Sequence, residues 1–354
     1  MADYTTIDDS SKYFQAETYT GGGANSTVTF SGNSDLQPDL LWIKSRTSGY
    51  DHNIFDTTRG IAKLLEPSNN NTENTNQTWI SGVGSDSFTI GVNEHNLSNS
   101  AGEYVAWAWK CNGGTTSTNS DGDIDTTVQV NQTAGMSIVS YSPPNATART
   151  IGHGLGAVPK AIIIRARNRT EDWHWFHYSA GTGGWRGNHA EAHNDNTVLG
   201  DALPTSSVYK VGTDFRMNGA YNYVGYFFAE VQGFSKFGAY YGNGQHDGAF
   251  VHTGFKPAFI MAKQEDSTEP WLMFDKARDP FNTTDKKLGM HVASAENSVS
   301  GGGDAGYNFI DVCSNGFKCR SNSGAMNGNG IRIIYWAWAE NPFVTSGGVA
   351  GTAK

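Results

Sequence analysis

The sequence is poor in charge and has no long hydrophobic run. Charged residues make up 17% of the 354 residues, against about 25% in a typical soluble domain. The basic residues are scattered, so we expect no nucleic-acid binding, which needs a basic patch or stripe. No stretch of 18 apolar residues occurs, which predicts that the chain has no membrane span. The formal net charge of −9 favours solubility.

A secretion signal and a disulfide framework are missing as well. Residues 1–4 lack the basic and apolar regions of a signal peptide. The chain has only three cysteines, Cys111, Cys313 and Cys319, and they cannot all pair with one another. We interpret all three as free thiols.

What the chain does have favours short strands joined by polar loops. Aromatic residues reach 12% and there are 43 glycines, together with many Asn, Thr and Ser residues. Aromatic and β-branched residues suit a pleated, half-buried surface, while Gly, Asn and Ser end strands and form turns. We therefore expect an all-β fold.

A module is repeated three times along the chain. Each copy has a proline followed by an apolar strand, at residues 38–44, 159–165 and 257–263. A basic residue lies six positions after each proline, and these are Lys44, Arg165 and Lys263. An aromatic residue lies 17 positions after each proline, and these are Phe55, Phe176 and Phe274. Self-similarity of this kind is typical of repeat architectures.

Two further strands recur in each copy. A strand is expected before the proline, at residues 14–20, 136–141 and 237–241, and an aromatic strand closes each copy at 104–109, 223–228 and 333–338. The closing strands alternate large and small side chains, which places the rings on one face and the small residues on the other. Short strands in modules of about 100 residues predict β-sandwiches resembling jelly rolls. We therefore expect three tandem β-sandwich modules.

The boundaries follow from the polar segments. We expect module one at 1–111, a polar linker at 112–130, module two at 131–231, module three at 232–345 and a C-terminal tail at 346–354. The Gly-, Thr- and Asn-rich residues 112–120 mark the main boundary.

The shared basic residue suggests a repeated structural role. In modules one and three an acid follows the shared phenylalanine, as Asp56 and Asp275. We expect each of these acids to form a cross-strand ion pair with the basic residue of its module. Module two has His177 at that place, which weakens the expectation there.

Sequence motifs for catalysis and metal binding fail on their spacing. His189 and His193 flank Glu191, whereas a zinc-protease helix needs the glutamate directly after the first histidine. Asp121, Asp123 and Asp125 begin like a calcium loop, but Thr126 and Gln132 occupy the positions that need Gly and Glu. The glycine-rich residues 152–156 are followed by a strand and not by a helix, so we interpret them as a turn that needs positive φ. We expect no catalytic residues, no metal ion and no cofactor.

The best candidates for ligand binding are aromatic. Trp173, His174, Trp175 and Trp185 lie close together in the sequence, and exposed rings beside polar groups suit stacking on a sugar. The alternative is that the tryptophans pack in the core, which is the usual place of large aromatic residues.

Five segments resemble a known family. Residues 121–140, 151–160, 233–244, 250–257 and 339–346 are similar to phage and prophage tail fibre or virion structural proteins, which are common in marine phages. The resemblance covers about residues 121–354 and is weaker over module one. It implies a location in the virion, and the class is commonly trimeric. It implies no catalytic residues and no agreed ligand site.

Taken together, residues and resemblance predict a bacteriophage virion structural protein. We expect a tail fibre, spike or receptor-binding component for host attachment, made in the host cytoplasm without a signal peptide. Its expected partners are other virion proteins, further copies of itself in a trimer, and a host surface glycan. Three alternatives are open: a capsid decoration or head fibre protein, a carbohydrate-binding lectin-like module, and a glycan-degrading enzyme. The enzyme would need two carboxylates at a fixed separation in a cleft, so we expect no enzyme.

Overall fold

The fold is nearly all β. The computed structural model describes residues 4–75, 79–92, 96–195, 199–298 and 309–351. Apart from strands, the described residues contain three short helical turns: η1 (Ser10–Lys12), η2 (Tyr178–Ala180) and α1 (Gly324–Asn327). The all-β expectation is confirmed.

Three large antiparallel sheets share one strand order. In each sheet the order is the same: the first strand of the repeat, the closing strand, the strand that follows the proline, and the strand that carries the shared phenylalanine. Each of these strands pairs with the next one in that order. The first sheet is β1 (Phe14–Thr20), β7 (Glu103–Trp109), β3 (Leu40–Ser45) and β4 (Asn53–Asp56). The second is β10 (Met136–Tyr141), β16 (Tyr223–Ala229), β12 (Pro159–Ala166), β13 (His174–His177) and β14 (Trp185–Arg186), extended beyond β10 by β9 (Thr126–Asn131) and β8 (Ser117–Asn119). The third is β17 (Ser235–Tyr241), β24 (Arg332–Pro342), β19 (Phe255–Gln264), β20 (Leu272–Asp275) and β21 (Leu288–Gly289).

The register of the sheets follows the repeat as well. Equivalent residues of the closing strand and the proline strand are cross-strand partners in every repeat. The pairs are Trp107 with Trp42, Tyr226 with Ile163 and Trp336 with Met261. The residues of each pair lie four positions after the proline and at the fourth place of the closing motif. The expected strands therefore form, and they pair in the same way in all three sheets.

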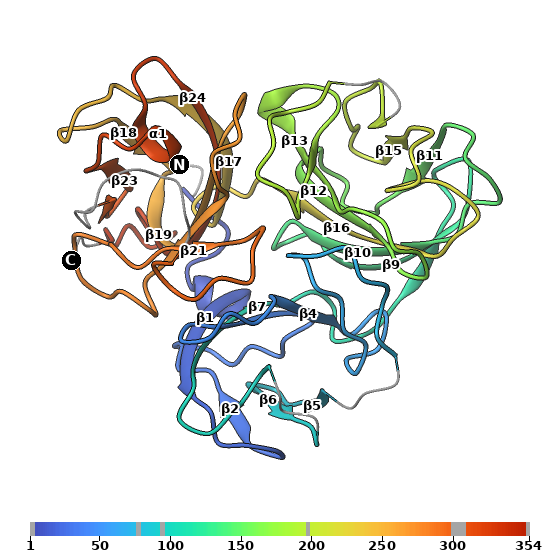
Figure 1. Cartoon of the computed structure of the whole chain (residues 1–354), viewed down its shortest axis with the longest axis horizontal. Helices are drawn as coiled ribbons and strands as arrows, with labels where there is room; N and C mark the ends of the chain where they lie inside the picture. Colours follow the sequence, from blue (N-terminus) through green and yellow to red (C-terminus); the bar gives the residue numbers. More distant parts are fainter. Residues whose placement is uncertain (1–3, 76–78, 93–95, 196–198, 299–308, 352–354) are drawn as a thin grey trace.

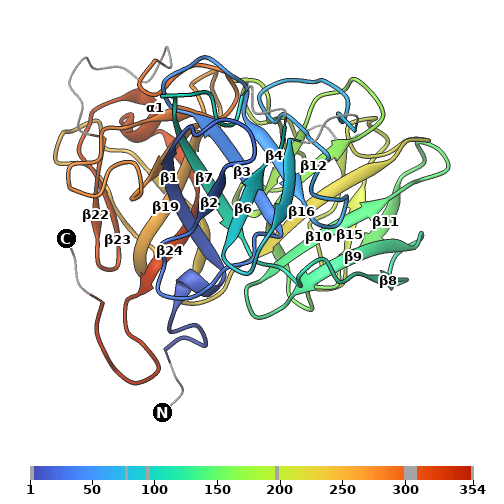
Figure 2. The same cartoon turned by 90° about the horizontal axis from the view of Figure 1, so that it is seen from below.

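A smaller sheet covers one face of each large sheet. The small sheets are β2 (Thr27–Thr29) with β6 (Ser87–Ile90) and β5 (Ile80–Val83), β11 (Arg149–Gly152) with β15 (Val208–Val211), and β18 (Phe250–His252) with β23 (Gly316–Cys319) and β22 (Ile310–Cys313). Figure 2 shows β2 and β6 in front of β7 and β3. In this layer Phe88 of the small sheet belongs to the same buried cluster as Leu41 and Ala106 of the large one. The two-layer packing is that of a β-sandwich.

The opposite faces of the three large sheets meet at the centre of the molecule (Figure 1). The closing strands alternate as expected, with Ala106 and Ala108 toward the small sheet and Trp107 and Trp109 toward the centre. The last aromatic residue of each closing motif reaches the other two. Ring centroids are 5.3 Å apart for Trp109 and Trp338, 5.3 Å for Phe228 and Trp338, and 6.3 Å for Trp109 and Phe228.

The repeats share a central core in addition to the cores of their own sandwiches. One cluster of buried side chains contains residues of all three repeats, while two further clusters lie within repeat two and within repeat one. A strand face that carries large rings cannot remain in water, and here it is buried against the other repeats. The three repeats form one body.

The polar linker expected at 112–130 differs from the structure. It contains β8 and most of β9, which add two strands to the edge of the second sheet. The side chain of Gln129 is buried and joins β9 to repeat one, since its Nε2 donates to the hydroxyls of Thr57 and Thr58 at 2.9 and 2.8 Å. An edge strand with one wet face can be rich in Thr and Asn, and the composition alone does not separate it from a loop. Beyond the sheets, the C-terminal segment returns to the N-terminal one, because the backbone N–H of Ser346 donates to Asp8 at 2.6 Å.

The expected ion pairs of the shared basic residue are wrong. The ammonium of Lys44 donates to the backbone carbonyls of Ser45 and Ser48 at 2.7 and 3.2 Å. Lys263 donates in the same way to Gln264 and Ser267 at 2.8 and 2.6 Å. Both side chains thus close the loop that follows their own strand. Burial lowers the pKa of each lysine to about 8. Arg165 likewise donates to the loop after its own strand, at the carbonyl of Glu171, and it also crosses to repeat one, where it donates to the carbonyls of Asn70 and Asn71 at 2.8 and 2.6 Å.

The two acids pair with arginines three residues later. Asp56 pairs with Arg59, and Asp275 pairs with Arg278 at 2.6 Å, with all four side chains fully buried. Each acid also accepts a bond from a closing strand of another repeat. The hydroxyl of Tyr226 donates to Asp56 at 2.8 Å, and the indole N–H of Trp107 donates to Asp275 at 3.1 Å.

His177 holds the same place in repeat two. Its Nδ1 accepts the backbone N–H of Ser179 at 3.2 Å, and its Nε2 lies 3.1 Å from the carbonyl oxygen of Tyr335 on the third closing strand. The residue after the shared phenylalanine therefore contacts a different repeat in each copy, and the three contacts close a ring.

A second ring of contacts is made by the backbone. The residue eight positions after each proline offers its carbonyl oxygen to a backbone N–H of another repeat. The three bonds are Glu73 to Arg167 at 2.8 Å, His193 to Glu265 at 2.8 Å and Glu296 to Arg46 at 2.7 Å. Ion pairs reinforce two of these contacts, with Arg167 and Glu73 at 2.8 Å and Arg46 and Glu296 at 3.0 Å. The repeats are thus interlocked at their edges as well as at the centre.

Because the core is shared, the chain should unfold in one cooperative transition. Calorimetry of the full chain should give equal calorimetric and van't Hoff enthalpies, which is the test of two-state unfolding. The fragment 1–111, whose central Trp42, Trp107 and Trp109 would face water, should lack the near-ultraviolet circular dichroism of packed tryptophans. Separate transitions, or a folded fragment, would contradict the shared core.

Glu73 should contribute much more to stability than an exposed acid. It bridges the buried Arg59 and the partly exposed Arg167 at 2.7 and 2.8 Å, so Glu73→Gln leaves the guanidinium of Arg59 buried with less compensation. We expect the free energy of unfolding in urea to fall by about 2–4 kcal/mol. The control is Asp247→Asn, which removes an ion pair to Lys318 from a side chain that is 81% exposed and should cost less than about 1 kcal/mol. Equal losses for the two variants would contradict the prediction.

Candidate ligand-binding site

The four aromatic residues favoured by the sequence are all buried. Trp173, His174, Trp175 and Trp185 have no exposed surface, so they cannot stack on a ligand from solution. The expectation of a sugar platform at these residues is therefore wrong, and the alternative of core packing holds.

These residues join the repeats. The indole N–H of Trp173 donates to the carbonyl oxygens of Glu66 and Asn69 at 3.0 and 3.1 Å, in repeat one. Trp175 is stacked on Trp336 with ring centroids 4.9 Å apart, and Trp185 lies 5.6 Å from Trp271, both in repeat three. The neighbouring repeats cover this edge of repeat two, and the large tryptophan rings fill the space between them.

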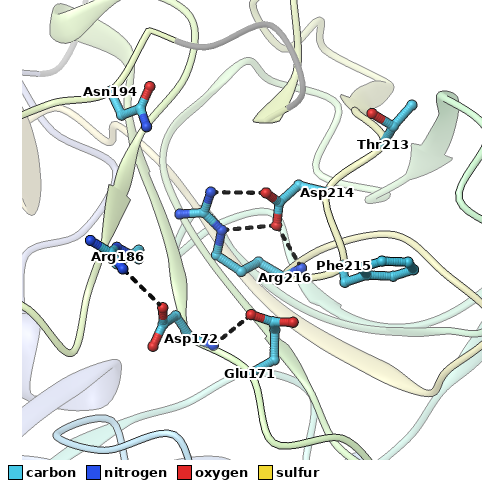
Figure 3. Close-up of a pocket in the computed structure, with 8 residues that line it drawn as sticks. All are labelled: Glu171, Asp172, Arg186, Asn194, Thr213, Asp214, Phe215 and Arg216. Atoms are coloured by element: carbon cyan, nitrogen blue, oxygen red, sulfur yellow. Dashed lines mark hydrogen bonds and ion pairs between the residues drawn. The ribbon is translucent and has the colours of Figure 1, made fainter.

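An open hollow lies just outside this aromatic cluster (Figure 3). Its volume is about 530 Å³, within the range of small-molecule sites. Three chain segments supply its walls: the loop after β12, the segment from β14 onward and the loop after β15. The lining residues are Glu171, Asp172, Arg186, Asn194, Thr213, Asp214, Phe215 and Arg216. We call this place the repeat-two hollow.

Asp214 and Arg216 form a two-pronged pair in the hollow. The Nε and Nη2 atoms of Arg216 donate to the two carboxylate oxygens of Asp214 at 2.8 and 2.9 Å, and the backbone N–H of Arg216 donates at 2.9 Å. Burial opposes the ionisation of Asp214, but the hydrogen bonds and charge of Arg216 outweigh it and lower the pKa of the carboxyl. Such bidentate pairs fix both groups in one plane.

Asp172 and Arg186 form the opposite wall. Asp172 accepts from the side chains of Asn188 and His189 at 2.9 and 3.1 Å, and Arg186 lies 3.6 Å away. Burial raises the pKa of Asp172, and these neighbours more than offset it, so the pKa lies below its usual value. Glu191 binds Arg186 from the other side, with Nε and the backbone N–H both donating at 2.9 Å to Oε1.

The false zinc motif therefore has a structural role. His189 and Glu191 hold Asp172 and Arg186, while the ring of His193 packs on Trp185 at 4.6 Å. The three side chains have separate partners. In the part of the chain that the structure describes, no group of three or more His, Cys, Asp or Glu side chains could hold a metal ion.

Phe215 gives the hollow an apolar rim. The residue is 44% exposed, and the guanidinium of Arg169 lies 4.6 Å from the ring centroid. Tyr221 contacts it edge to face at 6.2 Å. The ring is thus held in place and still presents a large part of its surface to solvent.

A second hollow occupies the equivalent place in repeat one. It measures about 480 Å³ and is lined in part by Glu66, Glu73, Asn74 and the half-buried Trp79. The backbones of Leu64 and Asn74 form a bridge there, as those of Gly184 and Asn194 do beside the repeat-two hollow. Both hollows therefore combine carboxylates, an asparagine and a partly exposed aromatic ring.

The remaining sequence motifs serve turns and loops. Asp123 accepts the backbone N–H of Thr150 at 2.6 Å, and Asp121 accepts the amide of Asn119 at 2.8 Å. In the glycine-rich residues 152–156, Gly154 and Gly156 have φ of +71° and +68°, as the turn interpretation requires. The cysteines are free thiols, as expected.

The loop 213–216 was not recognised from the sequence. Exposure of Phe215 follows from how the loop closes over β15, and no periodic pattern carries that information. The one available signal is the spacing of Asp214 and Arg216, two residues apart in a polar segment, which suits a local ion pair. Fixed hydrogen-bonding groups around an open volume beside a ring can bind a polar ligand, and their lowered pKa values do not suit a proton donor.

His174 behind the hollow should make stability fall in acid. Burial lowers its pKa to about 3, whereas an unfolded histidine has a pKa of about 6.5. Between these values only the unfolded chain binds the proton, so stabilisation is present above pH 6.5 and is lost as the pH falls. His174→Gln should reduce the slope of unfolding free energy between pH 6 and 4 by about 1.4 kcal/mol per pH unit. The measurement is urea unfolding across pH, with His246→Gln at an exposed site as control, and an unchanged slope for His174→Gln would contradict it.

Comparison with known proteins adds a family. A family model described as a domain of unknown function, DUF7483, matches residues 9–342. No curated protein and no solved structure matches the chain. The matched region runs through all three repeats, in keeping with their shared core. The chain belongs to the DUF7483 family.

Proposed function

We propose that this chain is a structural protein of a bacteriophage particle and that it acts in host attachment, as part of a tail fibre or spike. The resemblance of residues 121–140, 151–160, 233–244, 250–257 and 339–346 to phage virion proteins motivates the virion part. The observation that carries the attachment part is the repeat-two hollow on a rigid, interlocked body. Preformed sites on rigid bodies lose little entropy on binding.

The position of the hollow, at the end of the molecule opposite the terminal segments, supports attachment. The N-terminal segment reaches the start of β19, where the hydroxyl of Tyr4 donates to Gly254 at 2.7 Å. The segment beside the repeat-two hollow reaches the other end, where His193 bonds to Glu265. A ten-residue strand separates these ends by about 30 Å. The hollow therefore lies far from the packed terminal segments.

Binding without catalysis fits the carboxylates of the hollow. A glycan-degrading enzyme needs a carboxylic acid with a raised pKa as proton donor. Asp172 and Asp214 have lowered pKa values because cations and hydrogen-bond donors hold them. We propose a binding role for this site.

Capsid decoration is the second candidate. The described residues form a compact body with three lobes (Figure 1), and neither a heptad stalk nor a collagen-like repeat occurs in the sequence. A compact body suits a protein that coats a capsid. The trimer expected from the resemblance stays a prediction, and the threefold arrangement of sheets is already present within one chain. The described residues include no helix that could cross a membrane.

Immunogold electron microscopy tests the proposal. Antibodies to the purified chain should label the tail of particles of a phage that encodes it, and the purified chain should slow adsorption of those particles to host cells. Label on the capsid would favour decoration and overturn the attachment role. Purified particles that carry no label at all would overturn the virion assignment.

A further inference from the structure

We propose that the repeat-two hollow binds a neutral saccharide unit of a host-surface glycan. This rests on the proposed attachment function and specifies its ligand. The reasons lie in the charge of the hollow, its hydrogen-bonding groups, its aromatic rim and its recurrence in repeat one.

The charge of the hollow excludes an anionic ligand. Three carboxylates and two guanidinium groups line it, so the net charge is negative. Both arginines are already engaged by carboxylates, Arg216 by Asp214 and Arg186 by Asp172 and Glu191. The net negative charge of the lining repels a sialylated or sulfated ligand, whereas a neutral ligand meets no such repulsion.

The remaining hydrogen-bonding capacity suits hydroxyl groups. Carboxylate oxygens have more acceptor positions than the arginines occupy, and a guanidinium has five donors. Among the described residues, the Nη1 of Arg216 has no hydrogen-bond partner, and Figure 3 shows it turned toward the space beside Arg186 and Asn194. A sugar hydroxyl both donates and accepts, so it can bind a carboxylate and a guanidinium at once.

The rim supplies the apolar contact that sugars use. Phe215 presents 44% of its surface, and Arg169 and Tyr221 hold its ring. Aromatic rings with a polar neighbourhood combine apolar contact with directed hydrogen bonds. Phe215 thus takes the role of stacking on a sugar that the sequence suggested for Trp173 and Trp175, and unlike them it is exposed to solvent.

The recurrence of the hollow is an independent observation. The repeat-one hollow has the same place in its sheet, with Glu66 where repeat two has Arg186 and Asn74 where it has Asn194. Among the residues that the structure describes, the lining of this hollow contains the acids Glu66 and Glu73 and no basic residue. Arg59 and Arg167 are paired with Glu73. Two hollows that both contain carboxylates, an asparagine and an aromatic ring would bind two different units of one glycan chain and so increase the avidity.

The test uses the purified full chain and an array of neutral oligosaccharides printed beside their sialylated and sulfated counterparts. We expect binding to at least one neutral oligosaccharide and at least tenfold weaker binding to its charged counterparts. Phe215→Ala should weaken the binding at least tenfold in calorimetry, and Phe215→Trp should retain it. Phe281→Ala is the matched control, because Phe281 is 73% exposed in repeat three outside the hollow, and it should bind like the unchanged chain.

Three results would overturn the inference: no binding to any neutral oligosaccharide, preference for the charged ones, or equal binding by Phe215→Ala with an unchanged circular dichroism spectrum. The array does not depend on the particle. Tail labelling without glycan binding would overturn this inference alone, and glycan binding without labelled particles would overturn the virion assignment alone.

Discussion

The packing of three equivalent aromatic rings at the centre determines the rest of the structure. Trp109, Phe228 and Trp338 end the three closing motifs and contact one another across the repeats. A single sheet with such rings on its outer face would expose them to water, at a cost of about 2–3 kcal/mol for each. Three sheets arranged around one axis bury all of them. The threefold arrangement is therefore a consequence of the alternation of large and small residues in the closing strands.

The edges of the repeats extend this arrangement, though with unequal chemistry. Two interfaces carry a partly buried arginine and glutamate pair beside their backbone bond, through Glu73 and Glu296. At the third interface His193 takes the place of the glutamate, and the acid Glu265 lies on the other side, paired with Arg332. The backbone geometry is kept while the side chains vary, because the strand pairing sets the positions of the carbonyl and N–H groups. The threefold symmetry of this chain is therefore closer in the backbone than in the side chains.

The strands could be predicted from the sequence because the repeat consists of apolar and aromatic residues, whose spacing follows directly from strand geometry. The offsets from the prolines placed β3, β12 and β19 and their partners correctly. Three features could not be read in this way. β9 looks like a linker because one of its faces is wet. Lys44 looks like the partner of Asp56, although a backbone carbonyl is nearer. Trp175 looks like a surface platform, because no single repeat shows that another repeat covers it.

The difference between Trp175 and Phe215 shows where function can reside in such a chain. Residues that recur at fixed offsets, such as the shared phenylalanines and the closing aromatics, are committed to the core that all three repeats need. A ligand site has to come from positions where the repeats differ, because only there can a side chain change without loss of the common packing. The place of Arg186 is Glu66 in repeat one and Gly289 in repeat three, judged by the strand pairing of Trp175, Ile54 and Met273. The loops after β6, β15 and β23 likewise share their anchoring bonds, in which Tyr19, Tyr141 and Tyr240 donate to Leu97, Met217 and Met326. Between such fixed anchors the lining of the hollow can change from repeat to repeat, so one rigid body can offer related sites of different specificity.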